Sequence, residues 1–154
     1  MSIKGPADKR FIVGAVGLAV VGGILLLAVS GGSGRKVARV AHADPELQAA
    51  SKKAKSELGT FIKELSSPSE GKGFAIKGAF PTPAGPEYLW VKSPLLNKDL
   101  FVGVLDQEPL VLSGKHKGDI VVVKKADVYD WLIKDENGIR GMYTEKVLQT
   151  RAGR

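Results

Sequence analysis

The 154-residue sequence contains no cysteine and only two histidines. The absence of cysteine excludes disulfide bonds, a thiol nucleophile, cysteine-based metal sites and a lipid-modified cysteine anchor. His42 and His116 are far apart in the chain, and His116 stands between two lysines in a loop bounded by glycines. Two histidines in this arrangement do not form a metal site without several acids nearby. We therefore expect neither a metal nor a cofactor.

The second half of the chain lacks an excess of charge of either sign. The whole sequence has a net charge of +7, but residues 74–150 contain ten Lys and Arg against ten Asp and Glu. Residues 1–73 contain eleven basic residues against six acidic ones, and Arg151 and Arg154 supply the rest of the excess. A nucleic-acid-binding domain carries its basic excess on the folded surface. This distribution argues against nucleic acid as a partner.

Charge is also missing from residues 11–30, FIVGAVGLAVVGGILLLAVS, a run of twenty residues. At about 1.5 Å of rise per residue, such a helix spans roughly 30 Å, which is the thickness of the hydrocarbon core of a bilayer. Its backbone N–H and C=O groups pair within the helix, as a lipid environment requires. A polar leader, residues 1–10, ends in Lys9 and Arg10, and Arg35 and Lys36 follow the run on its other side. The sequence therefore predicts a transmembrane helix that contacts membrane lipid through residues 11–30.

A cleaved secretory signal is the alternative interpretation of residues 1–30. Ala28-Val29-Ser30 has the small residues of a cleavage site before Gly31, and cleavage there would release a secreted soluble domain. However, the apolar region of a secretory signal is normally about 7–15 residues long, and the run here is longer. We favour a retained anchor and a single-pass protein of the cell membrane.

The orientation follows from the leader. Lys4, Lys9 and Arg10, together with the α-amino group, make the leader difficult to translocate. Three basic residues also follow the apolar run, so the count alone does not decide between the two sides. We expect the amino end inside the cell and the remaining domain outside the cytoplasm.

Small residues recur every four positions within the predicted membrane helix, at Ala15, Ala19 and Gly23. Such a stripe lets two membrane helices approach each other closely. Glycine and alanine are also common in membrane helices that do not associate. The stripe would therefore permit, at most, a weak homo-oligomer.

Residues 31–43 are expected to be a flexible linker, and residues 44–150 one small α+β domain. Asp44-Pro45-Glu46 is typical of a helix start, with a capping side chain, a proline at the first helical position and an acid in the first turn. Apolar residues then recur at steps of three and four as far as Leu65. This pattern predicts one amphipathic helix over residues 44–65.

Strands should follow this helix. Runs rich in β-branched and aromatic residues predict strands at residues 74–80, 87–92, 100–105, 120–123, 128–134 and 139–143. The run at 100–105 is apolar on both faces, which favours a central strand with Gly103 at a bulge or a close approach. Asn137-Gly138 predicts a hairpin, and residues 144–149 a short closing helix. The expected fold is one helix packed on a mostly antiparallel sheet of about five or six strands.

Short motifs are distributed over residues 74–148. They are Phe74-x-Ile76-Lys77, Glu87-x-x-Trp90-Val91, Phe101-x-Gly103-x-Leu105, Gly118-Asp119-x-Val121, Asp130-Trp131 and Gly138-x-x-Gly141-x-Tyr143-Thr144. In this combination, residues 74–148 resemble the bacterial domain-of-unknown-function family 2314. One departure is Gln107, where the family pattern is expected to have asparagine. The resemblance implies a domain boundary and supplies no activity.

Two carboxylates stand among apolar strand residues. Alternation along VYDWLI predicts two groups, one of Tyr129, Trp131 and Ile133 and the other of Val128, Asp130 and Leu132. Glu87 is likewise in line with apolar residues of its own strand. A carboxylate at such a position is either buried and paired or part of a site.

Glu87 and Asp130 could carry out acid–base chemistry in a hydrolase-like enzyme if they converged near the tryptophans. We favour the alternative, in which each pairs with a lysine or a backbone N–H and stabilises the sheet. Trp90, Trp131 and Tyr143 are candidates for an aromatic surface that binds a ligand, although core packing is the commoner role of strand aromatics. The sequence thus favours a binding module for a protein or envelope partner over an enzyme.

Overall fold

The computed structural model of the protein describes residues 44–152. The predicted leader, the transmembrane helix with its stripe of small residues and the linker all lie outside these residues. Among the helices of residues 44–152, none has the length and hydrophobicity that a membrane span requires.

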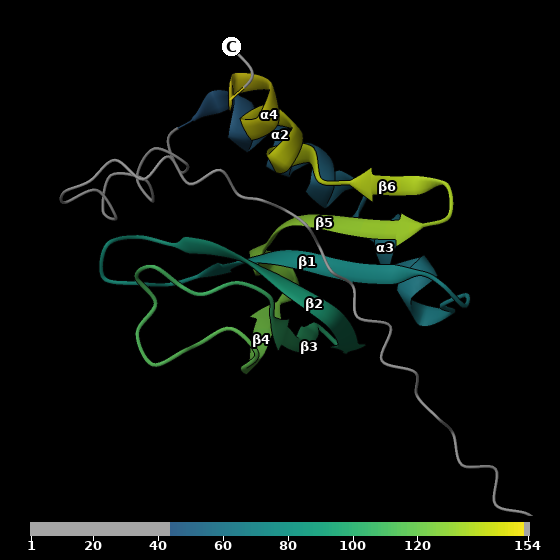
Figure 1. The fold of residues 1–154 in the computed structure, drawn as a ribbon, viewed down its shortest axis with the longest axis horizontal. Helices are drawn as coiled ribbons and strands as arrows, with labels where there is room; N and C mark the ends of the chain where they lie inside the picture. The colour runs from purple at the N-terminus through teal and green to yellow at the C-terminus, as the bar shows by residue number, and fades with distance from the viewer. Residues whose placement is uncertain (1–43, 153–154) are drawn as a thin grey trace, which may run out of the picture.

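The predicted α+β class is confirmed within residues 44–152, which form three α-helices and a six-stranded antiparallel sheet (Figure 1). In the sheet the strands are ordered β4-β3-β2-β1-β5-β6, and every neighbouring pair is antiparallel. The elements in chain order are α2 (Pro45–Ser56), α3 (Leu58–Ser66), β1 (Gly73–Phe80), β2 (Glu87–Asn97), β3 (Leu100–Leu105), β4 (Ile120–Lys124), the 3-10 turn η1 (Lys125–Asp127), β5 (Val128–Asp135), β6 (Gly138–Gly141) and α4 (Tyr143–Ala152).

The predicted single helix over residues 44–65 is wrong in one respect, because the structure has two helices there. Asp44 caps α2 by accepting hydrogen bonds from the N–H groups of Glu46 and Leu47, at 3.0 and 3.2 Å. The helix then breaks at Glu57, whose φ and ψ are −102° and 3°. Gly59, a poor helix former, follows the break closely. The break separates the two segments, so that α2 lies beside α4 while α3 packs its apolar side against the core.

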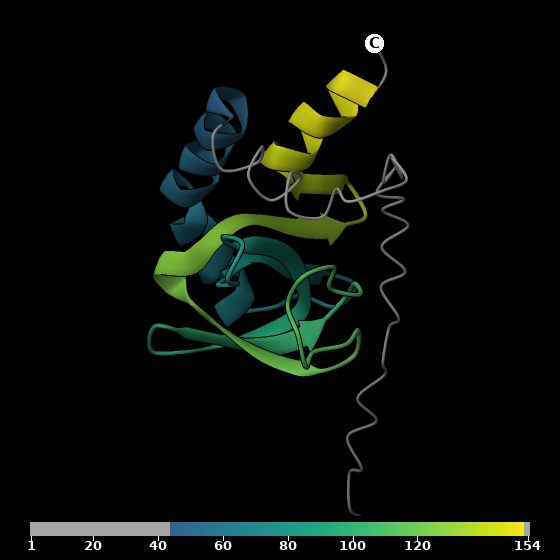
Figure 2. The ribbon, with the colours of Figure 1, turned by 90° about the vertical axis from the view of Figure 1, so that its left-hand side faces the viewer.

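The sheet is strongly curved (Figure 2), and the residues of the main core lie on its concave face. Phe61 of α3 is fully buried there and contacts Phe74 and Phe101, with ring centroids 5.9 and 6.2 Å apart. The predicted close approach at Gly103 is confirmed, since a Cβ there would lie 2.7 Å from Val91 Cγ1 and 2.8 Å from the Lys92 carbonyl oxygen. The helices and the curved sheet thus share one core.

The predicted alternation along β5 fails at Tyr129, because a bulge lies there. Lys77 pairs with Asp130, whereas the next residue of β1, Gly78, pairs with Val128, which leaves Tyr129 as the extra residue. Tyr129 stacks on Tyr88, with a centroid distance of 3.9 Å. Three other residues of β5 belong to the main core: Val128, Trp131 and Ile133.

The predicted hairpin at Asn137-Gly138 is confirmed by the antiparallel pairing of β5 with β6, in which Asp135 pairs with Gly138. Gly138 has a φ of +118°, a value that glycine adopts readily. β6 ends earlier than the sequence suggests, at Gly141, and α4 begins at Tyr143. The hairpin brings α4 back over the sheet next to α2 (Figure 1).

Candidate functional site

Asp130 is fully buried and fixes the first turn of α4. Its Oδ2 accepts hydrogen bonds from the backbone N–H and the hydroxyl of Thr144, both at 2.7 Å, and its Oδ1 accepts one from the Trp131 N–H at 2.8 Å. Burial raises the pKa of Asp130 above its usual value, while the bonds from Thr144 and Trp131 and the charge of Lys77 oppose this rise. The carboxylate therefore satisfies a free N–H of the helix start rather than facing a cleft.

Beside Asp130, a buried polar cluster connects β1, β2 and α4. The Nζ of Lys77 lies 2.5 Å from the Oε1 of Glu145, which also accepts a hydrogen bond from the Trp90 indole N–H at 3.2 Å. The same ammonium group lies 5.6 Å from the centre of the Trp90 ring. No sequence motif predicts this cluster. Its only local signal is a lysine within the otherwise apolar strand GFAIKGAF.

Glu87 fixes the long loop between β3 and β4. Its carboxylate accepts three backbone hydrogen bonds, from the N–H groups of Leu110, Val111 and Leu112, at 2.6, 3.1 and 2.7 Å. Glu87 is itself buried. Three convergent backbone N–H donors occupy both carboxylate oxygens, which gives Glu87 a structural role in holding the loop.

Gln107 has a related role where the family pattern is expected to have asparagine. The Oε1 of Gln107 accepts a hydrogen bond from the Trp90 N–H at 3.2 Å, and the Asp106 N–H donates to the Trp90 carbonyl at 2.9 Å. Pairing between β2 and β3 ends at Val91 and Leu105. The Gln107 side chain therefore continues the hydrogen bonding of β2 beyond the end of β3.

Trp131 and Tyr143 lie together in the core region, as packing residues. The Trp131 indole N–H donates to the Ala54 carbonyl at 2.8 Å, and its ring meets that of Tyr143 edge-on at 5.9 Å. The Tyr143 hydroxyl donates to a Glu57 carboxylate oxygen. Burial raises the pKa of Tyr143 to about 12, and the Glu57 carboxylate acts in the same direction. Tyr143 thus links α4 to the junction of α2 and α3.

The candidate residues do not form one site. Trp90 pairs with Lys77, whereas Trp131 is in register with Ile76, the preceding residue of β1, so the two indoles project from opposite faces of the sheet. The same register places Glu87 with the concave core, opposite Phe80, and Asp130 on the convex face, opposite Lys77. Neither an aromatic surface nor a pair of acids is assembled. Within residues 44–152, no three His, Cys, Asp or Glu side chains are arranged to hold a metal.

A group of aliphatic residues lies on the convex face of β3 and β4, toward the edge of the sheet opposite β6. These residues occupy neighbouring rows, because Val102 pairs with Leu95 and Val122, and Val104 pairs with Ile120. Four members of the group are strongly exposed: Leu95 by 73%, Leu100 by 43%, Ile120 by 69% and Val122 by 54%. We call the set Leu95, Leu100, Val102, Val104, Ile120 and Val122 the β3–β4 surface.

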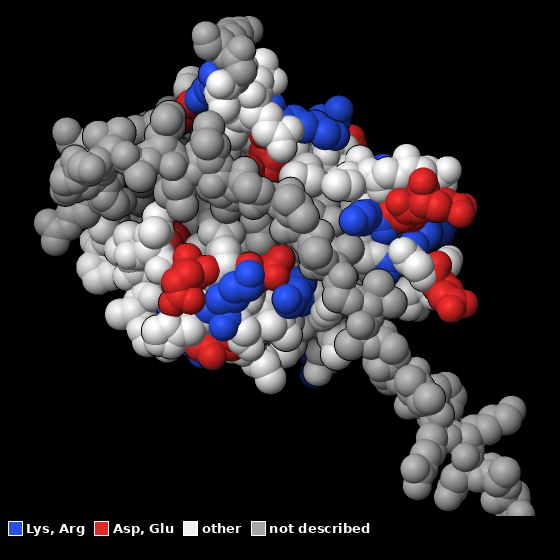
Figure 3. All heavy atoms as spheres, in the orientation of Figure 1, with Lys and Arg blue, Asp and Glu red and all other residues white. Residues whose placement is uncertain are grey.

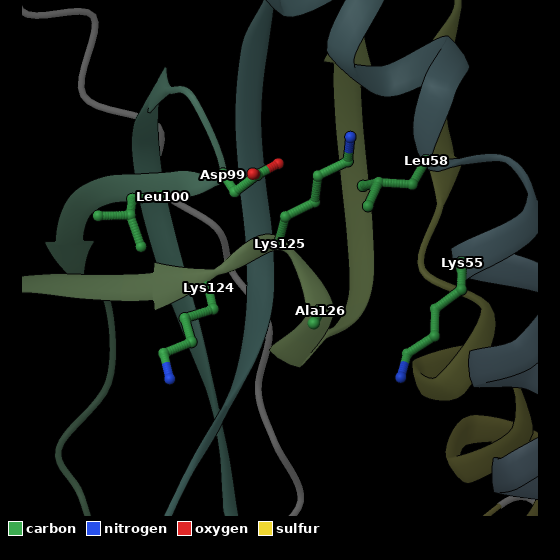
Figure 4. A pocket seen from close by; sticks show the side chains of 7 residues that line it. All are labelled: Lys55, Leu58, Asp99, Leu100, Lys124, Lys125 and Ala126. Carbon is green, nitrogen blue, oxygen red and sulfur yellow. The ribbon is translucent and has the colours of Figure 1, made fainter.

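A pocket of about 640 Å³ borders this surface at the end of β4 (Figure 4). Leu58, Leu100 and Ala126 supply apolar atoms. The remaining lining residues are charged, and three of the four are lysines: Lys55, Lys124, Lys125 and Asp99. On the face shown in Figure 3, by contrast, the visible basic and acidic side chains are interspersed.

Comparisons with known proteins find a family match and a distant relative. A family model described as an uncharacterized protein conserved in bacteria (DUF2314) matches residues 44–153. The uncharacterized protein YegJ of Escherichia coli (strain K12) is 27% identical over 93 residues, which cover 60% of this chain and 60% of that relative. This chain thus spans less than two thirds of the relative's length. No solved structure matches.

Proposed function

The chain belongs to the DUF2314 family of uncharacterized proteins conserved in bacteria, and we propose that it is a single-pass membrane-anchored protein whose α+β domain is an interaction module. Its partner in this proposal is a protein or other envelope component that binds the β3–β4 surface. The anchor is residues 11–30, and the domain lies outside the cytoplasm.

The observation that carries this proposal is the exposure of the β3–β4 surface. Single exposed aliphatic residues are ordinary on a soluble domain, but a contiguous group of them indicates a site of interaction. Here six aliphatic residues lie in adjacent rows of the sheet, and one of the two strands that carry most of them, β4, is at the sheet edge. An exposed apolar face next to an unpaired strand edge suits the binding of a protein segment.

The roles of Glu87 and Asp130 support binding over catalysis. Each carboxylate accepts three hydrogen bonds from nearby protein groups, and the two lie on opposite faces of the sheet. A hydrolase-like mechanism that uses both carboxylates needs them to converge on one bound substrate. The proposed anchor favours binding further, because tethering raises the effective concentration of a partner in the same envelope.

Site-directed photo-crosslinking in living cells tests this proposal. A photoreactive residue in place of Ile120 should form a discrete adduct with a protein or envelope component. The same residue in place of Lys52, which is exposed on α2, should not form it. Val122→Lys should abolish the adduct at position 120, since it places a charge in the centre of the β3–β4 surface. Indistinguishable products at positions 52 and 120 would contradict the proposal.

A further inference from the structure

We propose that the partner supplies an extended segment that pairs with β4 in antiparallel orientation and extends the sheet. In this segment an acidic residue lies opposite Lys124, and aliphatic residues lie opposite Val122 and Ile120. The inference rests on the proposed function and specifies the chemistry of the partner at the same surface.

The backbone of β4 has the arrangement that an added strand requires. The Lys125 N–H donates to the Asp99 carbonyl at 2.8 Å, and the Leu105 N–H donates to the Asp119 carbonyl at 2.9 Å. Because hydrogen-bonded and non-hydrogen-bonded pairs alternate in an antiparallel ladder, the odd-numbered residues of β4 bond to β3. The N–H and C=O groups of the even-numbered residues therefore point to the outer edge. They belong to Ile120, Val122 and Lys124.

This edge has few of the features that normally prevent strand addition. The sequence of β4, IVVVK, contains neither proline nor glycine, and its only charge is at the end. The opposite edge of the sheet, β6, has four residues, begins and ends with glycine, and carries Arg140, which is paired with Glu64 and Asp135. Of the two edges of the described sheet, β4 is the better template.

The side chains of β4 favour aliphatic residues in the partner. Ile120 and Val122 lie on the convex face and are mostly exposed, whereas Val121 and Val123 are buried in the concave core. Cross-strand neighbours contribute through direct side-chain contact. Aliphatic residues opposite Val122 and Ile120 would therefore extend the rows that already contain Val102 and Val104.

The charge at the end of β4 favours an acid. Figure 4 shows the side chains of Lys124, from β4, and Lys55, from α2, on either side of Ala126, with both ammonium groups extending in the same direction. None of the ion pairs among residues 44–152 includes Lys55, Lys124 or Lys125. A carboxylate at this position of the partner would complement these lysines.

A second copy of the chain and an anionic lipid surface fit these features less well. In an antiparallel pairing of two β4 strands about Val122, Lys124 would lie opposite Ile120 of the other copy, so the lysines would gain no acid. An anionic lipid would complement the lysines but would leave the outward N–H and C=O groups of β4 without partners. An acidic and aliphatic strand satisfies both the charges and the backbone.

Fluorescence anisotropy with defined peptides tests the proposal, using the full chain in a neutral detergent. The probe is a labelled peptide that contains Glu-Thr-Val-Thr-Ile, in which Glu meets Lys124 and the apolar residues meet Val122 and Ile120. N-methylation of the Val, whose N–H faces β4, should weaken binding by about tenfold or more. N-methylation of the preceding Thr, whose N–H points away from β4, is the matched control and should have a much smaller effect.

A charge exchange tests the acidic position. Lys124→Glu should weaken binding of the Glu peptide by about tenfold and improve binding of a peptide with Lys in its place. Lys134→Glu, at an exposed lysine outside the β3–β4 surface, should leave both affinities unchanged. Thermal unfolding of both variants establishes that the fold is retained.

Four results would overturn strand addition. They are equal effects of the two N-methyl groups, no peptide binding, self-association that Val122→Lys abolishes, and binding to vesicles of anionic phospholipid without peptide preference. If the crosslink at position 120 still captures a protein, the interaction module stands and only the binding mode is wrong. If that crosslink is absent as well, the proposed function fails.

Discussion

Asp130 and Thr144, which are 14 residues apart, are joined by two hydrogen bonds of 2.7 Å to one carboxylate oxygen. Together with the third bond, from the Trp131 N–H, they attach the start of α4 to β5. Only one residue of α4, Thr144, is buried. The position of α4 therefore depends on polar contacts as well as on the packing of Tyr143 against Trp131, and the Asp130 carboxylate makes the most buried of the polar contacts.

Asp130→Asn should destabilise the domain. Both carboxylate oxygens accept hydrogen bonds, so the amide nitrogen of asparagine would face a donor at one of the two positions. Leaving a buried donor unsatisfied costs about 1–3 kcal/mol. Denaturant unfolding of the purified chain measures this loss, with Lys52→Gln, at an exposed position of α2, as the control. A midpoint equal to or above that of the wild type would argue for a functional Asp130, because relief of an unfavourable site stabilises a fold.

Trp131→Ala should cost about 3–5 kcal/mol, enough to unfold a domain of this size. Trp131→Phe keeps most of the ring contacts with Phe61 and Tyr143 and removes the hydrogen bond to the Ala54 carbonyl. It should therefore be milder than the alanine variant. Equal losses from both variants would mean that the indole N–H, rather than ring packing, determines the stability at this position.

The loop between β3 and β4 should loosen in Glu87→Gln. The carboxylate accepts one N–H at Oε1 and two at Oε2, and an amide group cannot replace both oxygens. Limited proteolysis should then cut within residues 106–119 faster than in the wild type. Glu136→Gln, at an exposed hairpin residue, is the control and should leave the cleavage rate unchanged. Unchanged cleavage in Glu87→Gln would mean that other contacts hold the loop.

Part of this organisation is predictable from local sequence. The strands follow from their β-branched and aromatic residues, the start of α2 from Asp44-Pro45, and the hairpin from Asn137-Gly138. In each case the determining groups lie within a few residues of one another. The burial of Trp131 is consistent with its alternation with Ile133 on an apolar strand.

The remainder depends on contacts between distant residues. Lys77 and Glu145 are 68 residues apart, and neither has a neighbour in sequence that indicates the other. The bulge that displaces Tyr129 arises where β5 pairs with β1, so the register is visible only in the assembled sheet. Likewise, the separation of Glu87 from Asp130 is set by strand order and pairing. Alternation identifies each carboxylate as unusual but does not determine whether the two meet.

Acid should weaken the domain partly through Glu64. Hydrogen bonds from Arg140 and Lys72 lower the pKa of Glu64 from 4.5 to about 2. Because the folded-state pKa is lowered, the stabilisation is present above the ordinary value and is lost as the pH falls through about 2. Arg140→Gln should move the Glu64 pKa toward its ordinary value and shift acid unfolding to higher pH.

NMR titration of the Glu64 carboxyl measures that pKa directly. Lys134→Gln is the control for Arg140→Gln. It removes one positive charge from β5, the strand next to that of Arg140, without breaking any ion pair among the described residues. Asp130 changes stability with pH in the opposite direction. Because burial raises its pKa, its contribution to stability is present below the ordinary pKa of aspartate and is lost as the pH rises through the folded-state pKa. Equal acid midpoints for wild type and Arg140→Gln would contradict the role of Glu64.

The proposed anchor predicts the behaviour of the full chain in cells. Residues 11–30 are long enough to span a bilayer and are flanked by charge, so carbonate washing of membranes should leave the full-length chain in the pellet. If the domain lies outside, protease added to spheroplasts should digest residues after Gly34 and spare the leader. Replacing both Val20 and Val21 with Lys should release the chain from the membrane, because charge at the centre of a membrane helix is costly. A mature amino terminus at Gly31 would exclude the anchor, and full protection from protease would reverse the orientation.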